Sequence, residues 1–111
     1  MLIMKTEIPP GTLDMLILRS LLRATEMHGF EIAESIRQTS EDVLHVEEGS
    51  LYPSLQRMLL KGWVQAEWGK TAENRRARYY CLTALGRKHL EREIEKYQRV
   101  AVAISHVLET A

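Results

Sequence analysis

The stretch GSLYPSLQRMLLKGW, from Gly49 to Trp63, decides the fold of this chain. Its apolar residues recur at the spacing of one helical face: Leu51, Leu55, Met58 and Leu59. Gly62 supplies a stop signal near the end of the stretch. Pro53 fits such a helix in the first turn, where its missing N–H has no helical partner, and Ser50 is then the expected N-cap. The stretch predicts a helix with a polar start that faces a partner and an apolar side that packs on a core.

Two further helices are expected before this stretch. The first begins after Thr12 and is apolar nearly all round, which is typical of a helix buried on two sides. The residues proposed for its second, partner-facing side are Leu13, Leu16, Ile17 and Leu21. The second helix runs from about Phe30 to about Gln38, with Phe30 in its core stripe. The segment Val43–Val46 fits a short edge strand at best.

After Gly62 the apolar period changes from helical to alternating, which indicates strands. Trp63–Trp68 fits one strand, 69–74 is turn-like, and Arg75–Leu82 fits a returning strand. This predicts a β-hairpin with a basic tip and return strand. Its basic residues are Lys70, Arg75, Arg76 and Arg78.

A long helix is expected from Thr83 to about Leu108. At about 1.5 Å per residue it would reach roughly 39 Å, which is more than a small domain needs for its own core. Its apolar stripe suits pairing with another helix. The residues of that stripe proposed for dimerisation are Leu90, Ile94, Tyr97, Ala101, Ile104 and Leu108.

The charges of this 111-residue chain sum to zero but are unevenly distributed. Residues 1–49 hold 4 basic and 9 acidic side chains, residues 50–92 hold 9 and 3, and residues 93–111 hold 2 and 3. A basic middle in a neutral chain indicates a surface for a polyanion.

Several classes of protein are disfavoured by the sequence. The single cysteine, Cys81, allows no disulfide within the chain and suits a small buried hydrophobe. No segment has the length of a membrane span or the layout of a signal peptide, so a cytoplasmic protein without membrane contact is expected. We find no phosphate-binding glycine loop, no nucleophile with a base and no paired carboxylates, so no enzyme activity and no cofactor is expected. The four histidines lack metal-ligand spacing.

The order helix, helix, short strand, helix, hairpin, helix predicts a mainly α fold with a small β-hairpin. This is a winged helix-turn-helix followed by a C-terminal dimerisation helix. We divide the chain into an N-terminal arm (1–11), a winged helix-turn-helix DNA-binding domain (12–82) and the dimerisation helix (83–111). In such a fold the third helix fits the major groove, which is about 12 Å wide, while the hairpin reaches the phosphates.

The chain resembles the PadR family of bacterial transcriptional regulators. The motifs that carry the resemblance are MHGFEI from Met27, GSLYPSLQRMLLKGW from Gly49, EW at Glu67 and RRARYYCLTALGR from Arg75. The resemblance implies a homodimeric regulator, usually a repressor of a palindromic operator that a small-molecule effector releases. The short C-terminal helix resembles that of the smaller members.

The resemblance also implies which residues meet double-stranded DNA: Ser50, Tyr52, Pro53, Ser54 and Arg57 on the third helix, and Arg75, Arg76 and Arg78 on the hairpin. Lys70 is added because it belongs to the same basic cluster on the predicted hairpin, which favours phosphate contact. Gln56 departs from the histidine frequent in the family, so operator sequence does not transfer. Arg57 remains open between DNA contact and a solvated charge, and Tyr52 between packing and DNA contact. Trp63 and Trp68 remain open between core packing and an effector pocket. A winged-helix protein-interaction module and a small-molecule sensor without strong DNA affinity are the alternative functions.

Overall fold

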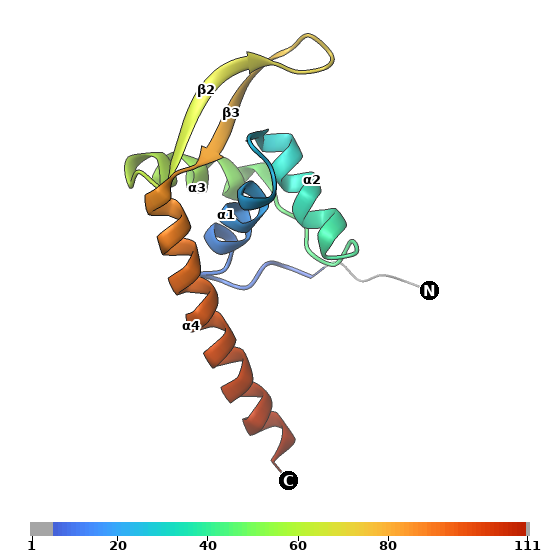
Figure 1. Cartoon of the computed structure of the whole chain (residues 1–111). Helices are drawn as coiled ribbons and strands as arrows, with labels where there is room; N and C mark the ends of the chain where they lie inside the picture. The colour runs from blue at the N-terminus through green and yellow to red at the C-terminus, as the bar shows by residue number, and fades with distance from the viewer. Residues whose placement is uncertain (1–5, 111) are drawn as a thin grey trace.

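The computed structural model describes residues 6–110, so residues 1–5 of the predicted arm lie outside the described residues. The elements follow the order α1 (Leu13–Arg23), β1 (Met27–His28), α2 (Gly29–Thr39), α3 (Glu48–Leu60), β2 (Val64–Lys70), β3 (Arg76–Leu82) and α4 (Ala84–Glu109). The three strands form one antiparallel sheet in the order β1-β3-β2. Figure 1 shows the β2–β3 hairpin projecting above the helices, with α4 leading away from them. The predicted mainly α class, with its hairpin and long last helix, is confirmed.

One apolar core joins the helices to the base of the hairpin. Its buried members are Ile17, Leu18, Leu21, Ile32, Ile36, Leu51, Leu55, Met58, Val64, Tyr80 and Leu90. The predicted core face of α3 therefore packs inward through three of its residues, while Leu59 is only partly buried against this cluster. Because α1 contacts α2, α3, β3 and α4, it is the central element of the core.

The position of α1 corrects part of the predicted dimerisation surface. Ile17, Leu21 and Leu90 are buried within this one chain, so their side chains have no surface left for a second subunit. α1 is apolar on most of its surface because α2, α3, β3 and α4 of the same chain pack around it. Leu13 and Leu16 are only half-buried.

The third strand of the sheet is not the one expected from the sequence. Within 43–46 only Leu44 makes a bridge, an isolated one with Thr6. The third strand is β1, in which Met27 pairs with Tyr80 and His28 with Tyr79. Two residues are too few for an alternating pattern, and His28 also caps α2 by a reciprocal capping box with Glu31.

Phe30 was expected in the core of α2 but is 69% exposed. Successive helical residues are rotated by about 100°, so Phe30 lies about 200° around the helix from Ile32. Ile32 and Ile36 face the core, and Phe30 therefore projects from the opposite side.

The start of α3 also differs from the expectation. The helix begins at Glu48 with Glu47 as its N-cap, so Ser50 does not cap it. Pro53 is the sixth helical residue and lies in the second turn rather than the first. Its missing N–H would have met the Gly49 carbonyl, and both residues are exposed, so water can reach that carbonyl.

A tight joint connects the end of α3, the start of β2 and the start of α4. The Thr83 hydroxyl donates to the Gly62 carbonyl oxygen at 2.6 Å and accepts from the Gly86 N–H at 3.0 Å. The Thr83 N–H donates to the Trp63 carbonyl oxygen at 3.1 Å. Gly86 presses so closely on this carbonyl that an added Cβ would lie 2.0 Å from the oxygen. Only glycine fits at this position.

The remainder of α4 extends away from α1, α2 and α3, as Figure 1 shows. The expected extent of this helix is confirmed, and Thr83 is its N-cap. Beyond Ile94 its large apolar side chains are exposed: Tyr97, Val100, Val102, Ile104, Val107 and Leu108. Between residues 6 and 110, no helix combines the length and apolar character needed to cross a membrane.

The Gly86→Ala variant should lower the free energy of unfolding by about 1–3 kcal/mol, because its methyl group has to displace the Trp63 backbone. Urea denaturation followed by far-UV circular dichroism measures this. The matched control is Gly49→Ala, since nothing lies within 4 Å of a Cβ there. The control should be neutral or raise stability by up to about 1 kcal/mol. Equal stability of Gly86→Ala and the wild type would contradict the joint described above.

Candidate nucleic-acid interface

The outward face of α3 is a stripe at helical spacing: Gly49, Pro53, Gln56 and Leu60. All four are exposed, and Leu60 is 80% exposed. Of these, only Pro53 was among the predicted contact residues. Gln56 was singled out only as a departure from the family pattern, and Leu60 was missed. Their spacing opposite the core residues Leu51, Leu55 and Met58 would have identified both as outward-facing.

Arg57 lies on the flank of α3 that faces α1. Its guanidinium Nη2 donates to both carboxylate oxygens of Asp14, at 2.8 and 3.0 Å. The same nitrogen donates to the Ser54 hydroxyl at 3.3 Å. Arg57 is thus a partly exposed link between α3 and α1, and Asp14 offsets its charge.

Ser54 is only 4% exposed, which corrects its assignment as a surface contact. It lies one turn before Met58 on the buried side of α3. Its hydroxyl is satisfied inside the chain by Arg57. A DNA base therefore has no access to Ser54 in this conformation.

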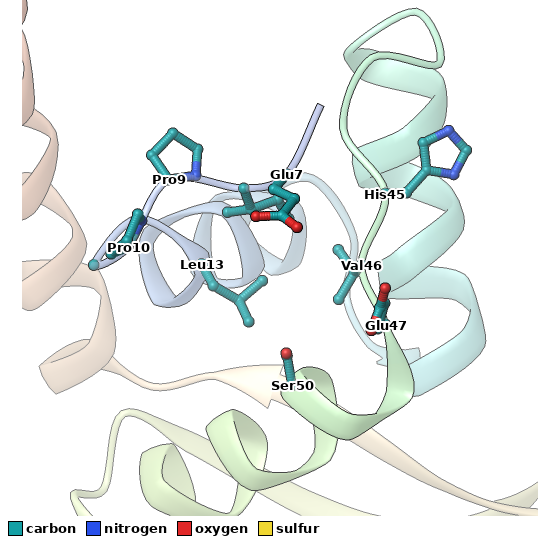
Figure 2. Close-up of a pocket in the computed structure, with 10 residues that line it drawn as sticks. Glu7, Pro9, Pro10, Leu13, His45, Val46, Glu47 and Ser50 are labelled. Carbon is teal, nitrogen blue, oxygen red and sulfur yellow. The ribbon is translucent and has the colours of Figure 1, made fainter. Parts of the chain in front are cut away.

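Ser50 is exposed but faces the N-terminal arm. Figure 2 shows its side chain directed into a pocket of about 350 Å³ that Leu13 and Val46 also line. Glu7 and Glu47 contribute carboxylates to the same pocket. Negative charge at a helix start stabilises the helix dipole but repels phosphate. The wing side of α3 is consequently the better side for a polyanion.

Tyr52 lies on the flank of α3 that faces the hairpin. A Cβ added at Gly29 would lie 2.7 Å from the Tyr52 hydroxyl oxygen and 2.9 Å from a ring carbon. Tyr52 thus packs against the start of α2, and it keeps 47% of its surface exposed. Tyr52 therefore packs on α2 and still has a ring that a ligand can reach.

The hairpin carries its positive charge on one face near the tip. In the strand register Trp68 faces Arg78 and Lys70 faces Arg76, so these four side chains share a face. The Arg76 guanidinium lies 4.3 Å from the Trp68 ring centre and that of Arg78 lies 5.8 Å away. Arg75 lies in the turn, and its N–H donates to the Thr71 hydroxyl at 3.2 Å. We call this surface the basic wing face (Trp68, Lys70, Arg75, Arg76, Arg78).

A cleft of about 540 Å³ lies between the basic wing face, the start of α2 and α3. We call it the wing cleft. Its main side chains are Phe30, Tyr52, Gln56, Trp68, Arg76 and Arg78. No carboxylate is among the described residues that line it. The wing cleft is therefore both aromatic and positively charged.

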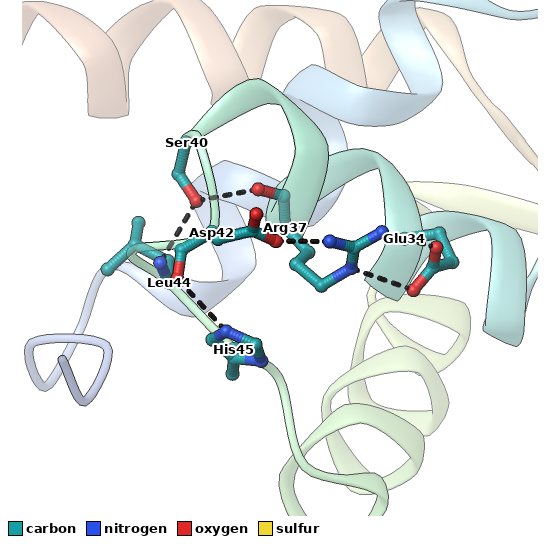
Figure 3. Close-up of polar contacts among 6 residues, drawn as sticks. All are labelled: Glu34, Arg37, Ser40, Asp42, Leu44 and His45. Carbon is teal, nitrogen blue, oxygen red and sulfur yellow. Dashed lines mark hydrogen bonds and ion pairs between the residues drawn. The ribbon is translucent and has the colours of Figure 1, made fainter. Parts of the chain in front are cut away.

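The loop that leads into α3 holds two consecutive residues in the left-handed region, Glu41 (φ 54°) and Asp42 (φ 66°). This conformation is costly for residues other than glycine, so neighbouring contacts must support it. Arg37 pairs with the Asp42 carboxylate and with Glu34, whose Oε2 lies 2.9 Å from Nη2 (Figure 3). The His45 ring Nε2 lies 3.0 Å from the Asp42 carbonyl oxygen.

The contacts of Arg37 shift the ionisation of its partner. Hydrogen bonds from Arg37 lower the pKa of the Glu34 carboxyl below its ordinary value of 4.5. The same pairing with Glu34, and then with Asp42, raises the pKa of Arg37 above its ordinary range. Both groups are therefore charged at neutral pH, and the ion pair helps to hold the loop before α3.

The two tryptophans have different neighbours within the chain. Trp63 stacks on His89 of α4, with ring centres 3.6 Å apart, and belongs to the joint. Trp68 lines the wing cleft and is 59% exposed. Within the described part of the chain, no group of three His, Cys, Asp or Glu side chains could hold a metal ion.

The chain is similar to known proteins over most of its length. The family model described as the Transcriptional regulator PadR-like family matches residues 17–92. The "Uncharacterized protein X" of Lysinibacillus sphaericus is 28% identical over 105 residues, which is 95% of each chain.

Solved structures are similar over most of the chain. A transcriptional regulator from Clostridium thermocellum is 25% identical with a TM-score of 0.78, covering 86% of this chain and 92% of that one. A PadR family transcription regulator from Clostridium difficile R20291 is 28% identical with a TM-score of 0.74, covering 88% and 99%.

The ion pair beside the left-handed loop predicts a pH-dependent contribution to stability. The lowered pKa of Glu34 means that this contribution is present above the unfolded-state pKa and is lost as the pH falls through the folded-state pKa. Glu34→Gln should therefore be less stable than the wild type at neutral pH, and the gap should narrow at about pH 3. Urea midpoints at the two pH values measure the effect.

Arg37→Met provides the control for this prediction. Because Glu34 acts through Arg37, Glu34→Gln should have little further effect at neutral pH when Arg37 is already replaced. If the two substitutions were simply additive, the assignment of the pH dependence to this pair would be wrong.

Proposed function

This chain belongs to the PadR-like family of transcriptional regulators and is a regulator rather than an enzyme, and from that premise we propose that it represses transcription by binding DNA as a homodimer. The observation that carries the proposal is the basic wing face beside the exposed stripe of α3. The operator would be palindromic, because the two halves of a homodimer present the same surface twice.

The basic wing face suits phosphate contacts. Lys70, Arg76 and Arg78 lie on one face of the hairpin. The described lining of the wing cleft brings no acidic side chain against the two arginines. Arginine donates two parallel hydrogen bonds to a phosphate, which fixes position as well as adding affinity. The wing would thus position the protein on the duplex.

The stripe of α3 suits the major groove. Gln56 carries an amide that can pair with the edge of adenine, and Leu60 offers an apolar contact of the kind that a thymine methyl accepts. Pro53 and Gly49 present no long side chain, which permits close approach of the helix backbone. Arg57, tied to Asp14, would contribute less charge than the wing.

Dimerisation through α4 completes the proposal. Ile94, Tyr97, Ala101, Ile104 and Leu108 are spaced by three, four, three and four residues, the heptad spacing of a two-helix seam. Tyr97, Ile104 and Leu108 are exposed in a single chain although they are apolar, and burial against a second α4 would remove them from water. The α3 helices of the two subunits would then enter successive major grooves, about 34 Å apart. Release by a small-molecule effector, which has to bind the two states unequally, remains part of the prediction.

For DNA binding, Arg76→Ala should weaken the affinity for a duplex from upstream of the chain's own gene. It should also reduce the slope of log affinity against log salt by about 1, since one phosphate contact is lost. Gel shifts at several salt concentrations measure both quantities. Arg57→Ala should have the smaller effect, because Asp14 offsets its charge.

The matched control is Arg23→Ala, which removes an exposed arginine between α1 and α2, away from the wing. It should leave the salt slope unchanged. Equal binding by the wild type and an Arg57→Ala, Arg76→Ala double variant would show that the assigned surface is wrong. A flat salt dependence of the wild type would favour the alternative of a protein-interaction module.

For dimerisation, Ile104→Glu should raise the dimer dissociation constant by at least about tenfold, because it puts a charge into an apolar seam. Light scattering after size-exclusion chromatography at several concentrations measures it. Val102→Glu makes the same kind of change on another side of α4 and should have the smaller effect. A dimer that tolerates both variants equally would exclude this seam.

A further inference from the structure

The wing cleft exposes more aromatic surface than phosphate binding explains. Phe30, Tyr52 and Trp68 come from three different elements, line the same cleft and remain exposed. Large apolar surface left in water at one place marks a binding site. The fold does not require Phe30 or Trp68 to be aromatic, since neither belongs to the core.

A regular DNA duplex offers these rings no free base face. In a duplex the faces of the bases are stacked on one another, and only their edges reach the grooves. An aromatic side chain gains most from a base whose face is free, and proteins that bind unpaired nucleotides combine such rings with arginine. The wing cleft has both groups, because the arginines of the basic wing face line it together with these rings.

The charged part of the cleft contacts its aromatic part. The Arg76 guanidinium lies over the Trp68 ring, 4.3 Å from its centre, which is a cation–π contact. An arginine held in this way retains N–H groups at its edge for a phosphate. Gln56 brings an amide to the same cleft, and this group can donate to and accept from a base edge.

We propose that the wing cleft binds one nucleotide, with its base stacked on Phe30 or Trp68 and its phosphate on Arg76 and Arg78. The volume of about 540 Å³ lies in the range of small-molecule sites. The nucleotide comes from one of two sources, an unpaired position in DNA or a free mononucleotide. This site does not require the chain to read paired DNA, so it extends beyond the proposed function.

The experiment uses the full-length protein with three probes: deoxyadenosine monophosphate, a short duplex of arbitrary sequence, and the same duplex with an unpaired bulge. Anisotropy of labelled DNA gives the two DNA affinities. Trp63→Phe leaves Trp68 as the only tryptophan, so its fluorescence reports mononucleotide binding. The bulged duplex should bind roughly 5- to 100-fold more tightly than the paired one, the gain expected from one stacked base.

At least one of the variants Phe30→Ala and Trp68→Ala should abolish that preference, while Gln65→Ala, on the opposite face of β2, should keep it. These variants alter exposed side chains, so folding should be retained. Quenching of Trp68 by the mononucleotide, lost in Phe30→Ala, without a bulge preference would support the site with a free nucleotide as its source. Binding of the bulged duplex or mononucleotide, without affinity for paired DNA from upstream of the chain's own gene, would support the site while contradicting the proposed function.

The inference is overturned if neither a bulge preference nor mononucleotide quenching is observed. It is also overturned if the preference survives in both Phe30→Ala and Trp68→Ala, because the base would then be bound elsewhere.

Discussion

The close approach of the first turn of α4 to the Gly62–Trp63 turn is the contact on which the other elements depend. At this place α3 has just ended, β2 begins, β3 ends and α4 starts. Thr83 ties the backbone on both sides of the contact, and Gly86 leaves no room for a side chain between them. α3, the hairpin and α4 therefore meet at one joint, so a change in the direction of one of them changes its angle to the other two.

Much of this architecture follows from local periodicity. The helical spacing that ends before Gly62 and the alternation that follows it predict α3 and the hairpin, because each pattern matches only one backbone geometry. Thr83 is likewise recognisable as an N-cap, since its hydroxyl satisfies an N–H that the helix itself leaves unpaired. The basic tip of the hairpin is visible as a run of arginines whatever the fold.

The remaining features depend on contacts between distant residues. Asp14 and Arg57 are 43 residues apart, and nothing near either one predicts their pairing. Phe30 looks like a core residue until the phase of α2 is fixed by His28 and Glu31 at its start. Ser54 and Pro53 are neighbours, yet one is buried and the other exposed, because the face of a helix changes by about 100° per residue. The spacing of core residues can indicate the phase of a helix, but which residues of different elements meet, such as Asp14 and Arg57, cannot be predicted from local pattern.

Because α4 is one uninterrupted helix, a change of angle at the joint moves its far end. A helix of 26 residues is roughly 39 Å long and stiff over that length. Tilting it by about 5° at its root displaces its far end by about 3 Å. α4 is in this sense a lever arm, because a small angular change near Gly86 becomes a much larger displacement at the C-terminal end of the helix.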